Sequence, residues 1–179
     1  MSSNILQKKI QRVEGKKNRL WLIAFLPHGS GNTPPVRLQL TQQGQPYSAY
    51  LGNISNGKVP YPLELTEARC HVLPGADINP SNAYAVTNLI ATSFIEIVRA
   101  DQVKVFEFAM ADSIEMSIPV IGTSSTSFTM SATSRPKRLE GNKQRFLQGD
   151  VCDVYFNLGS YVPWAQGCQI GVELSGYSI

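Results

Sequence analysis

The stretch FIEIVRADQVKVFEFAM (residues 94–110) holds two short segments rich in β-branched and aromatic residues, separated by a polar turn signal. Residues 94–99 and 103–110 predict two strands, and Asp101-Gln102 fits the tight turn between them. A third strand is expected at residues 114–118, after a second turn at Asp112-Ser113. Strands that follow each other this closely are typical of an all-β chain.

Segments of the same kind recur along the chain, about eight in all, between clusters of Gly, Pro, Asn and Ser. One short helix is expected over residues 80–90, because Asn79 can cap it and Pro80 suits its first position. We therefore predict an all-β fold, an antiparallel β-sandwich resembling a jelly roll, which has two packed sheets. The other predicted strands are residues 20–26, 36–40, 63–72, 128–132, 152–158 and 170–174, with a shorter one at 47–51.

The chain of 179 residues is long enough to bury a sizeable core without help from a metal or a disulfide. We divide it into a basic N-terminal arm, residues 1–19, and a single β-sandwich domain, residues 20–179, because the apolar strands begin at Leu20. Charged residues make up 16% of the chain, below the usual fraction of about 25%. The resulting neutral, polar surface suits burial against a partner, and it equally fits an ordinary β surface rich in Ser, Thr, Asn and Gln.

The net charge of +3 is unevenly distributed. Basic residues gather in the arm and in a second basic loop, residues 135–145, while the rest of the chain is acidic overall. Blocks of like charge bind an anionic partner or stay solvated. The candidate anionic partners are nucleic acid, a membrane surface and acidic faces of neighbouring subunits. The basic residues are Lys8, Lys9, Arg12, Lys16, Lys17 and Arg19 in the arm, and Arg135, Lys137, Arg138, Lys143 and Arg145 in the loop.

The arm also carries an apolar stripe. Over residues 2–14, Leu6, Ile10 and Val13 share one face of a predicted amphipathic helix. A lone helix of this length is marginal in water, so it should order only against a partner or the body of the protein. We predict that these three residues dock on a neighbouring subunit.

The sequence contains few groups of residues that could act in catalysis. Its two histidines, His28 and His71, and its three scattered cysteines do not provide the four or so close ligands of a zinc site. Cys70 and His71 are neighbours in a predicted strand and point to opposite faces, so they cannot form a nucleophile–base pair. Asp150 and Asp153 suit turns at strand ends better than a pair of catalytic acids. We expect no catalytic residue, no metal and no cofactor, and we predict that the protein is not an enzyme.

The cysteines indicate a reducing compartment. Cys70, Cys152 and Cys168 are odd in number and widely spaced, which does not fit a disulfide framework. The sequence has no apolar run of about 18 residues that would predict a transmembrane helix. The apolar run at residues 20–26 is short and lacks a cleavage site, so we expect no signal peptide.

The layout resembles a small coat protein of an icosahedral virus or phage. The matching features are the basic arm from Lys8 to Arg19, a body of β-sandwich size with long loops, and an end directly after a strand at Gly176-Tyr177-Ser178-Ile179. The resemblance covers the whole chain in organisation and includes no diagnostic motif. It implies a jelly roll in the shell and an arm inside the shell or between subunits. The six positive charges of the arm are fewer than in many genome-packaging arms, so arm exchange or contact with an internal membrane fits better.

This resemblance predicts a virion structural protein that is made in the host cytoplasm and self-assembles through loops and arm. Its partners would be copies of itself and other virion proteins, with nucleic acid or a membrane at the arm. A shell, vertex, spike or decoration role fits the composition equally well. The alternative is a carbohydrate-binding β-sandwich, a lectin-like or receptor-binding module that stacks sugars on Tyr47, Tyr50, Tyr61 and Trp164. A hydrolase is the weakest interpretation, because no credible acid/base pair is present.

Overall fold

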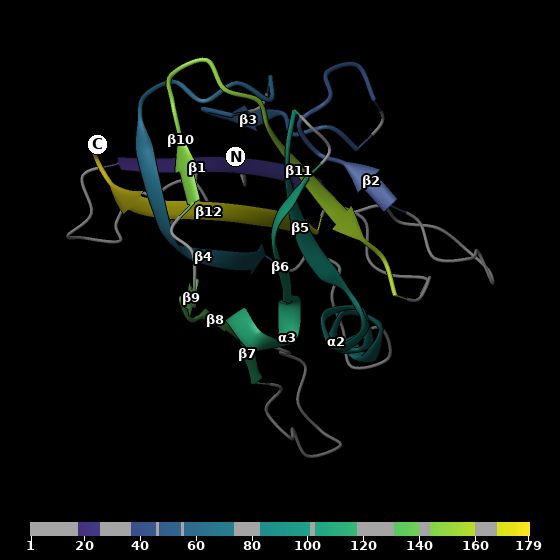
Figure 1. Cartoon of the computed structure of the whole chain (residues 1–179). Coiled ribbons are helices and arrows are strands. Elements are labelled where there is room, and N and C mark those ends of the chain that lie inside the picture. Colours follow the sequence, from purple (N-terminus) through teal and green to yellow (C-terminus); the bar gives the residue numbers. More distant parts are fainter. Residues whose placement is uncertain are drawn as a thin grey trace, which may run out of the picture.

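The structure is a computed structural model that describes residues 18–25, 37–45, 47–54, 56–73, 83–100, 103–117, 131–139, 144–159 and 168–179. Within these ranges the chain is mostly β, and its two main sheets are antiparallel and pack as a sandwich. Figure 1 shows strands of the smaller sheet passing across those of the larger one. The prediction of an antiparallel β-sandwich is confirmed.

Sheet A, the larger sheet, has the strand order β10-β4-β12-β1-β3, and β9 also pairs with β4. Its longest strands, β4 and β12, pair along nearly their whole length, from Leu73 opposite Gln169 to Glu64 opposite Tyr177. The strands are β1 (Asn18–Phe25), β3 (Leu51–Gly52), β4 (Leu63–Leu73), β9 (Lys137–Arg138), β10 (Gln144–Phe146) and β12 (Gln169–Tyr177).

Sheet B has the strand order β2-β11-β5-β6. Its strands are β2 (Arg37–Gln39), β5 (Phe94–Arg99), β6 (Lys104–Ala109) and β11 (Cys152–Asn157). A separate two-stranded sheet pairs β7 (Ile114–Ser117) with β8 (Ser131–Ser134). Two short helices, α2 (Ala83–Thr92) and α3 (Met110–Ser113), lie near one end of sheet B (Figure 1).

The alternation of side chains along the strands builds the core between the sheets. On sheet A, Leu20, Leu22, Val172 and Leu174 point inward, and on sheet B the inward residues include Ile95, Ile97, Val154 and Phe156. All of them are fully buried in one apolar cluster. Because strand neighbours point to opposite faces, the same alternation sends Arg19, His71, Glu173 and Tyr155 to the outer faces of the sheets.

Most predicted strands lie where the sequence placed them. The predicted strand at residues 94–99 is β5, the one at 63–72 is β4, and the one at 152–158 is β11. The predicted helix at 80–90 is α2, which the structure describes from Ala83 to Thr92. The predicted N-terminal helix at residues 2–14 lies outside the described residues.

The predicted tight turn at Asp112-Ser113 is wrong. The chain there forms helix α3, and β7 pairs with β8 instead of with β6. The buried Met110 side chain and the Ser113 hydroxyl explain the difference. That hydroxyl accepts the amide of Cys70 at 2.8 Å and donates to the carbonyl of Arg135 at 2.8 Å, which ties α3 to β4 and to the segment after β8. Within the described residues, α3 is therefore a short helix that the sequence did not predict.

The second basic loop is also more regular than expected, because β9 and β10 lie within it. The fully buried Phe146 attaches β10 to Leu63 in β4. The amide of Leu139 donates to the carbonyl of Thr66 in β4 at 2.9 Å. A few apolar side chains thus hold a largely basic segment along the edge of sheet A.

Candidate functional site

A polar pocket of about 260 Å³ lies on the outer face of sheet B, beside the edge strand β2. One of its lining residues is Tyr155 of β11, which pairs directly with Gln39 of β2. We call it the β2 pocket; its lining residues are Arg37, Leu38, Gln39, Gln42, Gln45, Tyr47 and Tyr155. These described residues include no carboxylate; they contribute amides, aromatic rings, one leucine and one guanidinium.

Arg37 is fixed in this pocket by two contacts. Its guanidinium carbon lies 3.4 Å from the centre of the Tyr155 ring, a cation–π contact. Its Nε donates to Oε2 of Glu96 at 2.9 Å, and this hydrogen bond raises the pKa of Arg37. Burial alone would raise the pKa of Glu96, but the hydrogen bonds from Arg37 and Asn157 outweigh it and hold that pKa below its ordinary value of 4.5. The positive charge of Arg37 in the pocket is therefore already neutralised by the Glu96 carboxylate.

The loop that carries the other pocket residues is anchored at its base. Thr41 donates its hydroxyl to Oδ1 of Asp153 in β11 at 2.8 Å. The amide of Ala49 donates to the carbonyl of Leu40 at 2.8 Å, and that of Ser48 donates to the carbonyl of Gln45 at 3.0 Å. The left-handed Gly44, with φ of 80°, allows the loop to reverse. These bonds hold Gln42, Gln45 and Tyr47 in place around Tyr155.

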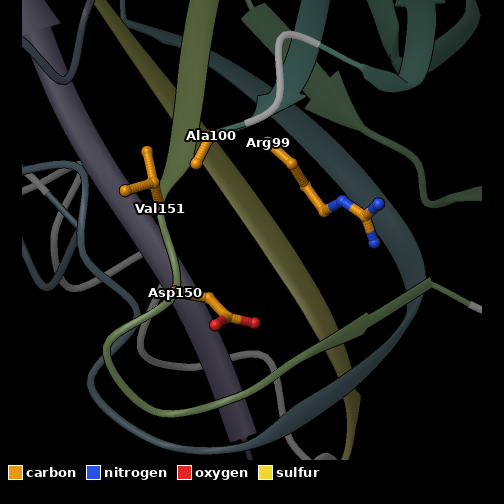
Figure 2. A pocket seen from close by; sticks show the side chains of 4 residues that line it. All are labelled: Arg99, Ala100, Asp150 and Val151. Atoms are coloured by element: carbon orange, nitrogen blue, oxygen red, sulfur yellow. The ribbon is translucent and has the colours of Figure 1, made fainter.

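A second pocket, also about 260 Å³, lies at one end of the sandwich and is lined by Arg99, Ala100, Asp150 and Val151. Figure 2 shows the Arg99 and Asp150 side chains on opposite sides of it. Oδ2 of Asp150 accepts the amide of Leu147 at 2.6 Å, and the Asp150 carbonyl accepts the amide of Val59 at 2.9 Å. Asp150 thus closes the turn before β11, as the sequence predicted.

A polar cluster lies on the outer face of sheet A, where His71 and Glu173 are 2% and 1% exposed. Nε2 of His71 is 3.4 Å from Oε2 of Glu173, and Nε of Arg19 is 3.7 Å from Oε1 of Glu173. Four buried polar atoms here have no hydrogen-bond partner: Nε of Arg69, Nδ1 of His71, Oε1 of Gln169 and Oε1 of Glu173. This cluster could not be predicted from the sequence, because the alternation along the strands predicts an exposed face for these residues.

The basic residues of the second loop are mostly paired with acids. Arg135 bonds to Glu115, Lys137 lies 3.1 Å from Asp112, and Nε of Arg145 lies 3.0 Å from Oε2 of Glu64. Arg138 is exposed in β9, opposite Glu67 of β4. Lys143 lies outside the described residues. These pairs reduce the positive charge that this loop presents to a partner.

Of the arm residues predicted to bind an anion or dock on a subunit, the structure describes Arg19, which lies in β1 beside Glu173. The positions predicted for anion binding or subunit docking that lie outside the described residues are Lys8, Lys9, Arg12, Lys16, Lys17, Leu6, Ile10 and Val13.

Three of the four aromatic residues singled out for sugar stacking are described, and their contacts differ. Tyr47 lines the β2 pocket, whereas Tyr50 stacks on Phe25 with ring centres 4.6 Å apart. The Tyr61 hydroxyl donates to the carbonyl of Arg19 and accepts from the Asn53 amide group at 3.1 Å, so it anchors a loop to β1. Trp164 lies outside the described residues.

The cysteines Cys70, Cys152 and Cys168 are buried free thiols. Burial raises the pKa of Cys70 far above its ordinary value, and burial together with the charge of Asp153 raises that of Cys152 to about 12.

Among the described residues, no group of three or more His, Cys, Asp or Glu side chains could hold a metal ion. In the same ranges, no helix is long and apolar enough to cross a membrane.

Comparison with protein-family models, with curated proteins and with solved structures finds no match to this chain.

Proposed function

We propose that this chain is a virion structural protein, a capsid or capsid-associated subunit whose sandwich is a jelly roll. The observation that carries the proposal is the nesting of strand pairs. Taking β1, β2, β4, β5, β6, β10, β11 and β12 in chain order, the first pairs with the last and the second with the seventh. The third pairs with the sixth and the fourth with the fifth.

This nesting is what results when one long antiparallel hairpin of eight strands is rolled into two sheets. The rolled hairpin gives sheets with the orders 1-8-3-6 and 2-7-4-5, which match β1-β12-β4-β10 and β2-β11-β5-β6. Double-sheet jelly rolls of eight strands recur in viral capsid domains, and also in lectins and cupins. The fold is therefore compatible with a capsid function, but it does not by itself distinguish that function from those of lectins and cupins.

An exposed pair of stacked aromatic residues is the second observation that supports assembly. Phe25 at the end of β1 and Tyr50 before β3 stack on each other, yet their side chains are 46% and 40% exposed. Burying such a pair between identical subunits would remove apolar surface from water at the edge of sheet A. We infer that copies of the chain form a homo-oligomer of closed symmetry through this edge, the loops and the arm.

The partners and the location follow from the same proposal. The chain would be made in the host cytoplasm and reside in the virion, with copies of itself and other virion proteins as neighbours. Within the shell, the basic arm would exchange between subunits or face nucleic acid or an internal membrane.

Electron microscopy and light scattering of the purified full-length chain, over a range of salt and protein concentrations, test the proposal. We expect closed particles or rings, and we expect Phe25→Ser and Tyr50→Ser to weaken their formation. Tyr84→Ser is the matched control, because Tyr84 is a 73% exposed aromatic residue on helix α2. A folded protein that stays monomeric under every condition would contradict the assembly function.

A further inference from the structure

We propose that the β2 pocket binds one neutral sugar ring, the terminal pyranose of a glycan. The pocket does not depend on assembly, so this binding function goes beyond the structural one. Its volume of about 260 Å³ is just below the range of about 300–1,000 Å³ typical for drug-sized ligands, which suits a single small ring.

The lining has the donors and acceptors that sugar hydroxyls require. A primary amide offers both a donor and an acceptor, and neighbouring hydroxyls on a pyranose do the same. Three amides, those of Gln39, Gln42 and Gln45, surround the pocket. Within the described residues, the side chains of Gln42 and Gln45 make no hydrogen bond and are exposed, so they are free to bind a ligand.

The aromatic residues provide the apolar part of the site. The Tyr155 side chain is 9% exposed and its ring is covered by the guanidinium of Arg37, so Tyr155 supports Arg37 from below. Tyr47 is half-buried at the wall and can present a ring face to the C–H groups of a sugar. Apolar contact on one side and hydrogen bonds at the rim form a common arrangement in small-ligand sites.

The charge of the pocket selects a neutral ligand over a nucleotide. Sites for single-stranded nucleic acid combine stacking with a positively charged groove that follows the phosphates. Among the described residues that line the pocket, Arg37 is the one cation, and Glu96 already neutralises it through the 2.9 Å hydrogen bond. An anion would have to compete with Glu96 for this guanidinium, whereas a hydroxyl can accept from its remaining N–H groups without displacing the carboxylate.

The loop is built to keep this geometry in the absence of ligand. The Thr41–Asp153 and Leu40–Ala49 hydrogen bonds fix both ends of the segment that carries Gln42 and Gln45. A fixed loop reduces the entropy lost on binding, which matters most for a small ligand with few contacts.

Saturation-transfer NMR with the methyl pyranosides of galactose, glucose, mannose and N-acetylglucosamine tests the proposal on the full-length protein. We expect at least one glycoside to bind with a dissociation constant on the order of 1 mM. Gln42→Ala and Gln45→Ala should each weaken it by about three- to tenfold through the lost hydrogen bond. Gln43→Ala is the matched control, since Gln43 is exposed on the same loop and does not line the pocket. Tyr47→Phe should keep the binding that Tyr47→Ala loses.

Three results would overturn the proposal. They are no binding by any of the four glycosides, binding that Gln42→Ala and Gln45→Ala leave unchanged, and stronger binding of adenosine monophosphate than of any glycoside. Because Gln42 and Gln45 are exposed, their variants keep the test valid even if Tyr47→Ala does not fold. Light scattering on the same samples separates this result from the assembly function, since the pocket variants should assemble like the unaltered chain.

Discussion

His71 of β4 and Glu173 of β12 face each other on the outer side of sheet A, with Nε2 and Oε2 3.4 Å apart and both side chains almost fully buried. Arg19 of β1 approaches the other carboxylate oxygen, so three strands contribute to one polar cluster. Gly171 of β12 pairs with His71 of β4 on one side and with the buried Ile23 of β1 on the other. It adds no side chain to this face of the sheet. Buried charges of this kind are stable only while their partners are present.

Removing the carboxylate from this cluster should destabilise the fold. Glu173→Ala removes the carboxylate that His71 and Arg19 approach, and losing one partner of a buried pair costs about 3 kcal/mol or more. Urea unfolding followed by tryptophan fluorescence measures the loss. The control is Glu115→Ala, because Glu115 is 57% exposed in its pair with Arg135 and should cost below about 1 kcal/mol. Equal losses in the two variants would mean that the cluster contributes no more than a surface ion pair.

The sequence predicted the long strands well, and for a physical reason. Strands β5, β11 and β12 have one face in the core, so their apolar residues alternate and reveal both the strand and its buried face. Strands β9 and β10 have two and three residues, too few to show an alternation, and polar side chains dominate the segment around them.

The candidate sites were harder to predict, because strand pairing brings distant segments together. The β2 pocket joins β2 and its loop to Tyr155, which follows them by more than a hundred residues in the chain. Tyr47 was singled out from the sequence as a candidate for sugar stacking, but no local pattern could reveal that three glutamines and Arg37 line the same pocket. The His71–Glu173 pair is hidden for the same reason, since it depends on the register of β4 against β12.

Gly176 should tolerate no side chain. A Cβ there would lie 1.9 Å from the carbonyl oxygen of Glu64, at the point where the β12–β4 register shifts. Gly176→Ala must push two paired strands apart, and we expect a loss of more than about 2 kcal/mol in thermal or urea unfolding. Gly44→Ala separates this clash from simple backbone strain, because Gly44 has φ of 80° but nothing within 4 Å of an added Cβ. A Gly176→Ala protein as stable as Gly44→Ala would show that β12 is not held against β4 as described.

Acid should weaken the contact between Arg37 and Glu96. The pKa of Glu96 is lowered in the folded protein, so the carboxylate stabilises the fold above its unfolded value near 4.5, and this contribution is lost as the pH falls through the folded pKa. The unaltered protein should exceed Glu96→Gln in stability by about 0.5–1 kcal/mol at neutral pH. Unfolding in urea at a series of pH values should reveal a gap that narrows below pH 4.5. A gap that widens on acidification would mean that the pKa of Glu96 is raised.

The thiols should be unreactive in the folded protein. Cys70, Cys152 and Cys168 are buried, and burial raises the pKa values of Cys70 and Cys152, the latter to about 12. Because the thiolate is the reactive form, a disulfide reagent such as DTNB at mildly alkaline pH should label the native chain very slowly. In guanidinium chloride all three thiols should react at once. Rapid labelling of the native protein would place at least one cysteine outside the core.

The central claim is that the sandwich assembles with copies of itself, and sedimentation velocity of the full-length chain tests it most directly. The measurement should cover increasing protein concentration at low and high salt. A second sample lacking residues 1–17, which leaves β1 whole from Asn18, separates the arm from the sandwich. We predict a discrete, fast-sedimenting species for the full chain and its loss in the truncated, still folded protein, with little effect of salt if Leu6, Ile10 and Val13 dock on a neighbour. A single monomer boundary for the full chain at every concentration and salt would contradict the account.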